Sequence, residues 1–112
     1  MAEELWKASA VELAAGIRDK RFSCVEVMTS VVARIRAVNP KLNAIVVDRS
    51  EQALAAAAAA DRARTSGVEL GALFGVPVTI KVNVDQEGEA TTNGLPAFAT
   101  VIAPADAPLV RH

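Results

Sequence analysis

The sequence predicts an α/β protein in which helices cover a small sheet. Three stretches have the polar starts and apolar spacing of helices, and two shorter stretches have the β-branched composition of strands. In chain order the predicted elements are two helices, a strand, a third helix, a second strand and a loop, an order typical of helices packed on a sheet. Two strands alone make a poor sheet, since three or more are usually needed for stability. We therefore expect these residues to be one edge of something larger.

Each of the first two predicted helices starts at a capping box. Ser9 and Ser23 are each followed three residues later by glutamate, so that serine and glutamate can each bond the other's backbone N–H. The first helix is expected to run to about Asp19, with an inward set of Val11, Ala14, Ala15 and Ile17. The second is expected to stop at Asn39, before Pro40, and its apolar stripe is Val27, Met28, Val31, Val32, Ile35 and Val38.

The third predicted helix runs from Ser50 to about Arg64 and is dominated by alanine, the strongest helix former. The two predicted strands lie on either side of it. Residues 44–47 form a short, continuously apolar, β-branched run, which is consistent with a buried strand. Residues 78–84 alternate apolar and polar side chains with period two. This pattern places Lys81 on the polar face of a rigid strand, flanked by Thr79 and Asn83.

Two interpretations of Lys81 follow from the pattern. In the first it is a solvated lysine on an outer strand, where it protects a sheet edge from unwanted pairing, and periodicity alone favours this reading because charged residues are mostly exposed. In the second it is a buried lysine that can lose its proton and act as a general base, because burial disfavours the charged form. Periodicity cannot decide between the two.

Composition limits the classes of function. Twelve basic and thirteen acidic residues give a formal charge of −1 with no basic patch, so we expect no direct nucleic-acid partner. The longest apolar run, residues 53–60, is far shorter than a membrane span, and the acidic N-terminus does not resemble a signal peptide. We expect a cytoplasmic protein without a membrane partner. Cys24 is expected to be a small buried hydrophobe, and with His112 as the one histidine there is no metal-site spacing, so neither metal nor cofactor is expected.

The stretch around Lys81 forms a specific sequence motif: Gly71-Ala-Leu-Phe-Gly75-Val-Pro77-Val-Thr-Ile-Lys81-Val-Asn83-Val-Asp85, then Gly88 and Thr91-Thr92-Asn93-Gly94. It resembles the segment around the catalytic lysine of the amidase signature family, serine hydrolases that cleave carboxamides with a Ser–cis-Ser–Lys triad. The N-terminal helices and Asn39-Pro40-Lys41-Leu42-Asn43-Ala44 also look like the family's beginning. Two positions depart from the family pattern: Val82 stands where aspartate is usual, and Leu95 where a small hydroxylated residue is common.

The resemblance implies a fold and one catalytic role. Residues 1–112 would be the N-terminal part of a single amidase domain, holding the helices and first strands of a three-layer α/β/α mixed-sheet fold that is incomplete in this chain. Lys81 would be the general base that activates the serine pair, and Thr91, Thr92 and Asn93 are candidates for the wall of the site. A polar turn that satisfies its own backbone is an equally good interpretation of those three residues.

The serine pair that the resemblance calls for is absent. The chain has no Gly-Ser-Ser run, and its serines all fall at predicted helix caps or on predicted helices: Ser9, Ser23, Ser30, Ser50 and Ser66. We therefore expect an amidase fragment that is inactive alone and would act on a small-molecule amide once completed. One alternative within the family is the amide-hydrolysing component of a tRNA-dependent amidotransferase. Another is a naturally truncated, non-catalytic module that self-associates or binds a partner through uncovered apolar faces.

Overall fold

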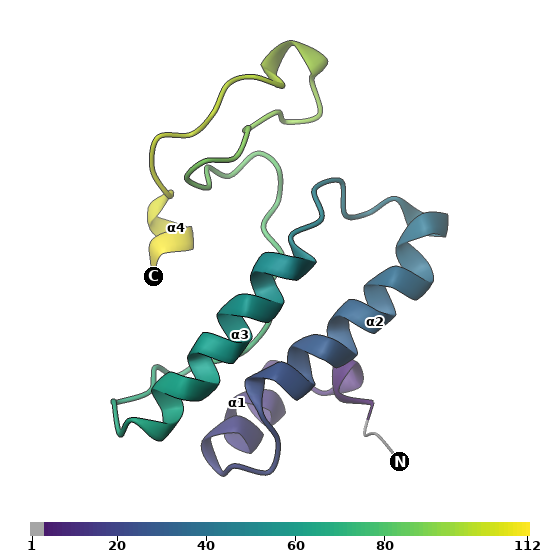
Figure 1. Cartoon of the computed structure of the whole chain (residues 1–112). Helices are drawn as coiled ribbons and strands as arrows, with labels where there is room; N and C mark the ends of the chain where they lie inside the picture. Colours follow the sequence, from purple (N-terminus) through teal and green to yellow (C-terminus); the bar gives the residue numbers. More distant parts are fainter. Residues whose placement is uncertain (1–3) are drawn as a thin grey trace. The chain divides into compact units, whose positions relative to one another are not determined.

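The computed structural model describes residues 4–112 and divides the chain into two units, Met1–Pro77 and Val78–His112. The first unit is helical and the second is an irregular loop with two short helical turns (Figure 1). The helical unit contains η1 (Leu5–Lys7), α1 (Ala10–Arg18), α2 (Cys24–Leu42) and α3 (Ser50–Thr65). The loop unit contains η2 (Pro96–Phe98) and α4 (Pro108–Arg111).

Both predicted capping boxes are confirmed. At the start of α1 the Ser9 hydroxyl accepts a hydrogen bond from the Glu12 backbone N–H at 3.2 Å, and the Glu12 carboxylate accepts one from the Ser9 N–H at 2.7 Å. At the start of α2 the same pair of bonds joins Ser23 and Glu26, at 3.0 and 2.7 Å. Two helix starts are thus encoded in four residues each.

The predicted end of the second helix is wrong. Helix α2 continues through Pro40 to Leu42 and ends at Asn43, whose left-handed backbone (φ 48°) donates its N–H to the Asn39 carbonyl at 2.7 Å. Proline removes one backbone donor and crowds the preceding turn, but here it falls in the last turn, where only a few residues still have to follow the helix. Asparagine is one of the residues that tolerates the left-handed cap.

The side chain of Asn39 explains why this extended end is stable. Its Oδ1 accepts hydrogen bonds from the backbone N–H groups of Ala44 and Ile45, both at 2.9 Å, and its Nδ2 donates to the Ile45 carbonyl at 3.0 Å. One side chain therefore satisfies three backbone groups of the chain that leaves the helix. The Asn-Pro-Lys-Leu-Asn-Ala sequence thus specifies both the end of the helix and the side chain that caps it.

Helices α2 and α3 lie side by side and run in opposite directions, and α1 lies across one end of the pair (Figure 1). The core between them contains Leu5, Leu13, Ile17, Cys24, Val27 and Ala57. The predicted apolar stripe of α2 does face this side, since Val27 and Val32 are buried and the other four members are half-buried. On α1 the prediction was partly wrong: Val11 is 77% exposed. It precedes Leu13 by two residues, which places it about 200° around the helix, on the far side.

Gly75 lies near the end of the helical unit and packs closely against its core. Its backbone is left-handed (φ 78°), and a Cβ atom at this position would lie 2.6 Å from the Cys24 sulfur and 2.8 Å from Cδ1 of Ile17. Both the conformation and the close approach need glycine. Phe74 and Val76 on either side pack against the core. The first part of the Gly71–Gly94 motif therefore packs against the helices.

The predicted sheet is not confirmed. Residues 4–112 form no strand; the only pairing is an isolated antiparallel bridge between Ala90 and Ile102. Residues 44–47 are irregular, and residues 78–81 have no regular structure before a turn that begins after Lys81. A strand is stable only when a neighbour bonds its backbone, and neither segment has one. Their apolar side chains are correspondingly uncovered: Val46 is 65% and Val78 is 72% exposed.

None of the helices in the part of the chain that the structure describes combines the length and the apolar character needed to cross a membrane.

Candidate functional site

Lys81 lies at the start of a turn in the loop unit. Its carbonyl oxygen accepts a hydrogen bond from the Val84 N–H at 3.0 Å, which closes the turn. The side chain is exposed, and among residues 4–112 no group forms a hydrogen bond or ion pair with its ammonium group. The structure therefore places Lys81 on a defined backbone turn rather than on the predicted strand, with its amino group free to meet other groups.

The second candidate segment lies beside this turn. The Asn93 N–H donates a hydrogen bond to the carbonyl of Val82, the residue after Lys81, at 3.3 Å. Asn93 has a left-handed backbone (φ 47°) and Gly94 follows with φ 77°. These two residues form the tip of the Thr-Thr-Asn-Gly turn. This bond brings together two turns that lie about a dozen positions apart in the sequence.

The two threonine hydroxyls of this segment are already engaged. Thr91 Oγ1 donates to Oδ1 of Asp85 at 2.5 Å, and Thr92 Oγ1 accepts from the Gly94 N–H at 3.2 Å. Thr92 therefore behaves as a turn residue that satisfies its own backbone. Thr91 instead bonds across the loop. The interpretation as a self-satisfied polar turn fits Thr92 and Asn93 better than it fits Thr91.

Asp85 is the residue that sequence reasoning left without a role. Besides bonding Thr91, it accepts the Ala107 N–H on its own carbonyl at 3.0 Å. A second carboxylate acts nearby, because Asp106 Oδ1 accepts the Glu87 N–H at 2.8 Å. The sequence carries no local signal for the bond to Thr91, because a spacing of six residues lies outside the short-range patterns in which aspartate side chains bond nearby groups.

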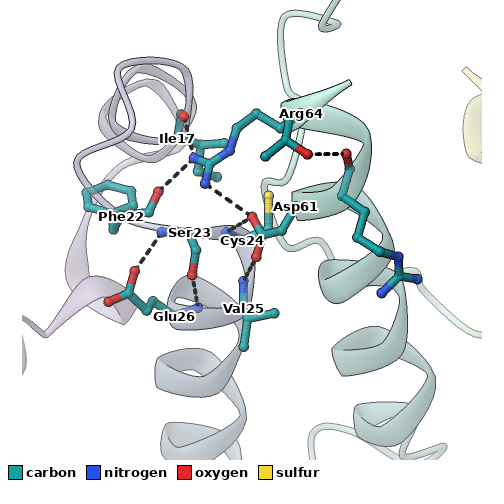
Figure 2. A network of polar contacts seen from close by, with 10 residues as sticks. Ile17, Phe22, Ser23, Cys24, Val25, Glu26, Asp61 and Arg64 are labelled. Carbon is teal, nitrogen blue, oxygen red and sulfur yellow. Dashed lines mark hydrogen bonds and ion pairs between the residues drawn. The ribbon is translucent and has the colours of Figure 1, made fainter. Parts of the chain in front are cut away.

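A second polar cluster lies in the helical unit and joins all three helices (Figure 2). The Asp61 carboxylate on α3 accepts the first two free N–H groups of α2, from Cys24 at 2.8 Å and Val25 at 3.0 Å. One turn later, Arg64 Nη1 donates to the carbonyls of Ile17 and Phe22, at 2.8 and 3.1 Å. The two side chains also form an ion pair, with Nη2 3.6 Å from Oδ1. We call Asp61 and Arg64 the α3 clamp.

The charges of the α3 clamp are explained by capping. Burial alone would raise the pKa of Asp61, but the backbone donors of Cys24 and Val25, together with Arg64, outweigh it and hold that pKa below the usual range. A carboxylate at a helix N-terminus is also favoured by the helix dipole. The Asp61 carboxylate and Arg64 Nη1 serve backbone groups at helix ends, while Arg64 Nε is buried without a hydrogen-bond partner. These contacts explain the clamp as a structural cap, so we do not treat it as a second candidate active site.

Cys24 is confirmed as a buried small residue. Its side chain is 1% exposed, and burial, followed by the hydrogen bond and charge of Asp61, raises the pKa of its thiol to about 11. A nucleophilic cysteine needs the opposite shift and access to solvent. Among residues 4–112 no group of three or more His, Cys, Asp or Glu side chains is arranged to hold a metal ion.

The sequence pattern of the amidase family matches residues 26–112, which is more than half of the chain. This chain belongs to the amidase family. The matched range contains most of α2, all of α3 and the whole loop unit, so Lys81 and its neighbours lie inside it. The resemblance read from the Gly71–Gly94 wording is thereby confirmed.

Several amidase-family relatives resemble this chain along most of its length. Indoleacetamide hydrolase of Bradyrhizobium diazoefficiens is 56% identical over 108 residues, which cover 96% of this chain and 21% of that protein. A glutamyl-tRNA(Gln) amidotransferase subunit of Moorella thermoacetica is 38% identical over 109 residues, 97% of this chain and 22% of that protein. Acylamidase of Rhodococcus erythropolis is 39% identical over 102 residues, 91% of this chain and 21% of that protein.

A solved structure supports the same relationship. It belongs to a vestigial protein complex that reveals the evolutionary origins of an s-triazine catabolic enzyme, and it superimposes with a TM-score of 0.86 at 34% identity over 93% of this chain and 23% of that one. This amidase-family chain therefore spans about a fifth of the length of the relatives that it matches.

Proposed function

We propose that this chain supplies the lysine base of an amidase that hydrolyses a carboxamide to a carboxylate and ammonia. The observation that carries the proposal is the position of Lys81: it stands in the Gly-Val-Pro-Val-Thr-Ile-Lys wording, inside the range that matches the amidase family. We further propose that residues 1–112 are the N-terminal part of a single amidase domain, in keeping with the fifth of each relative that they cover.

The proposed chemistry is acyl transfer through serine. The neutral Lys81 amine takes a proton from a serine pair, and the nucleophilic serine oxygen bonds to the amide carbonyl carbon. The proton then passes to the amide nitrogen as the C–N bond breaks, which releases ammonia and leaves the acyl-serine ester. Water then cleaves the acyl-serine ester to the carboxylate. A lysine base has to be neutral, which burial favours. The Lys81 side chain is exposed, so in the proposed complete site other residues would have to bury its amine.

We infer that the 112-residue chain alone does not hydrolyse amides, because no serine is available as a nucleophile. Each serine hydroxyl has a local duty: Ser9 and Ser23 cap helices, Ser30 accepts the Trp6 N–H, Ser50 donates to Asp48 and Ser66 donates to the Ala63 carbonyl. All five lie in residues 4–77, whereas Lys81 lies in the loop unit.

The relatives suggest which substrate to test first. Indoleacetamide hydrolase is 56% identical to this chain, against 39% for acylamidase and 38% for the protein from the amidotransferase. We propose an aromatic acetamide as substrate and indoleacetamide as its first representative. A glutaminyl side-chain amide, the natural choice for the amidotransferase branch, is the second substrate to assay.

A chimaera tests the proposal. This chain replaces the aligned segment of the Bradyrhizobium enzyme, so that residues outside the segment complete the site, and ammonia release from indoleacetamide is measured. Lys81→Ala is expected to lower kcat by about 10²–10⁴-fold, the usual share of a general base. The matched control is Lys41→Ala, an exposed lysine at the end of α2, which should leave kcat within about twofold. Full activity of Lys81→Ala would refute the assignment of the base, whereas turnover by the 112-residue chain alone would refute the inference that this chain is inactive by itself.

The second candidate function is an interaction module. The loop unit exposes several large apolar side chains: Leu95, Phe98, Val101 and Ile102 are 43–54% exposed. Exposed apolar groups of this kind favour self-association or partner binding. Size-exclusion chromatography of the 112-residue chain discriminates the two: a stable monomer at micromolar concentration counts against the module, and a defined oligomer supports it.

A further inference from the structure

Asp85 bonds across the loop unit with both its side chain and its backbone, and so does its side-chain partner Thr91. Asp85 Oδ1 accepts the Thr91 hydroxyl at 2.5 Å, and the Asp85 carbonyl accepts the Ala107 N–H at 3.0 Å. Asp85 is nonetheless exposed. Its position, directly after the Lys81 turn, suggests a use.

We propose that Asp85 is a positioning residue that holds the Lys81 turn in its reactive shape through Thr91. This inference rests on the proposed function, since it concerns the same lysine.

The first step of the argument concerns the backbone of the turn. The bond from the Val84 N–H to the Lys81 carbonyl closes the turn on one side. On the other side the Asn93 N–H reaches the Val82 carbonyl, at 3.3 Å. This second bond is long for an N–H···O bond. A bond of this length is weak, so further contacts of the Thr-Thr-Asn-Gly turn should help to hold it near Val82.

The second step identifies what holds it. Thr91 lies two residues before Asn93, and the bond to Asp85 is short and charge-assisted, which makes it one of the stronger polar contacts available to an exposed side chain. The Thr91 N–H also donates to the Val101 carbonyl, at 3.2 Å. Thr91 is therefore held by its side chain and by its backbone. In this proposal these two bonds keep Asn93, two residues later, within reach of the Val82 carbonyl.

The third step compares Asp85 with its neighbours. Asp106 bonds a backbone N–H, that of Glu87, and so anchors the far part of the loop. Thr92 bonds only its own turn. The Asp85 side chain links the residues that follow Lys81 to the segment that contacts Val82. Small displacements of a catalytic group are costly to rate, so a residue that fixes this turn should affect kcat more than substrate binding.

The test uses the indoleacetamide hydrolase chimaera and measures kcat and KM per folded protein, with folding checked by circular dichroism. Asp85→Ala and Thr91→Val are each expected to lower kcat by about tenfold and to leave KM within about twofold. Thr91→Ser keeps the hydroxyl and should retain activity within about threefold. The kcat of the double variant should be no lower than that of the poorer single variant, because both substitutions remove the same hydrogen bond.

Matched controls come from the same unit. Thr100→Val and Glu87→Ala change exposed side chains that form no cross-loop hydrogen bond of their own among the described residues, and both should leave kcat within about twofold. If Asp85→Ala fails to fold, the comparison of Thr91→Val with Thr91→Ser decides the question alone.

Three results would overturn the inference: Asp85→Ala or Thr91→Val within twofold of the parent, Thr91→Ser as impaired as Thr91→Val, or kcat losses that multiply in the double variant. Lys81→Ala, measured in parallel, separates this failure from that of the proposed function. If Lys81→Ala abolishes turnover while Asp85→Ala does not change it, only the role of Asp85 is wrong. If Lys81→Ala is fully active, the proposed function itself is wrong.

Discussion

The two units of this chain are ordered by different kinds of interaction. In residues 4–77, Ile17, Val27 and Cys24 are fully buried between helices whose ends are capped by side chains. In residues 78–112 Ala103 is the one buried residue, and backbone hydrogen bonds such as Gly88 N–H to Ala103 O, at 3.0 Å, hold the loop. The helical unit has a core of its own, whereas the unit that carries Lys81 has very little.

This difference indicates where each part of the sequence obtains its stability. Apolar burial contributes about 25 cal/mol per Å² and needs side chains that face one another. The helical unit has such an arrangement. The loop unit instead leaves Val78, Leu95 and Leu109 exposed, at 72, 49 and 77%, and depends on a few cross-loop bonds. Changes in core packing should therefore be felt in the helical unit, and changes in polar contacts should act locally in the loop unit.

The largest effect is expected for Gly75→Ala. The new Cβ would approach the Cys24 sulfur and Ile17 to less than 3 Å, and alanine in a left-handed backbone adds about 1–2 kcal/mol to an overpacking cost of about 1–3 kcal/mol. We expect a loss of about 2–5 kcal/mol in the free energy of unfolding, measured by urea denaturation with circular dichroism at 222 nm.

Gly67→Ala is the matched control for that change. Gly67 has the same left-handed backbone (φ 80°), but a Cβ there would meet no atom within 4 Å. It should lose about 1–2 kcal/mol, the conformational part alone. Equal losses at the two glycines would contradict the view that Gly75 is required by packing.

The next effect compares the same substitution in the two units. Asp61→Ala removes the acceptor of two N–H groups of α2 and leaves Arg64, 13% exposed, without its ion-pair partner. We expect a loss of about 2–3 kcal/mol, since unsatisfied buried donors and charges are costly. Asp85→Ala removes an exposed acceptor of the loop unit.

For Asp85→Ala the helical unfolding transition should move by less than about 0.5 kcal/mol, as is usual for exposed sites. The measurement is again denaturation at 222 nm, which reports the helices. A loss at Asp85 as large as that at Asp61 would show that the two units unfold together, and the contrast between them would have to be abandoned.

The sequence predicted the helical unit well because its signals are local. Ser9 with Glu12 and Ser23 with Glu26 each specify a helix start within four residues, and the alanine run specifies α3. The end of α2 was mispredicted because a rule about Pro40 was applied without the opposing contribution of Asn39, whose side chain bonds three groups beyond the helix. Asp61 and Arg64 were not identified, since nothing local marks an exposed-looking charge as a partner for a helix end 37 residues away.

The loop unit was predicted less well, for a related reason. Alternation over residues 78–84 fits a strand only if a neighbouring strand bonds its backbone, and the described residues offer one isolated bridge instead. The family resemblance nevertheless located the amidase motif around Lys81 correctly. Three of its glycines, Gly75, Gly88 and Gly94, have left-handed backbones, and Gly75 is also required by packing. The bond between Asp85 and Thr91 was missed because their spacing of six matches no regular element.

The smallest expected effect is the change in stability at low pH. Asp61 has a pKa below that of an aspartate in an unfolded chain, about 3.9. Its contribution to stability is therefore fully present above about pH 4 and is lost as the pH falls through the lower value in the folded protein. In Asp61→Asn the amide still offers one acceptor, but it places an NH₂ group against one of the two N–H donors of α2. The variant should be less stable than the parent at pH 6.

The gap between the melting temperatures of the parent and Asp61→Asn should narrow when both are measured from pH 6 down to pH 3. Both proteins keep Glu12, whose pKa is lowered by the Ser9 backbone donor, and Asp48, whose pKa is lowered by the Ser50 hydroxyl. The acid sensitivity of these two groups cancels in the comparison, so the narrowing reports Asp61. A gap that stays constant across this range would mean that Asp61 caps α2 through shape alone, and that its charge adds nothing to the helical unit.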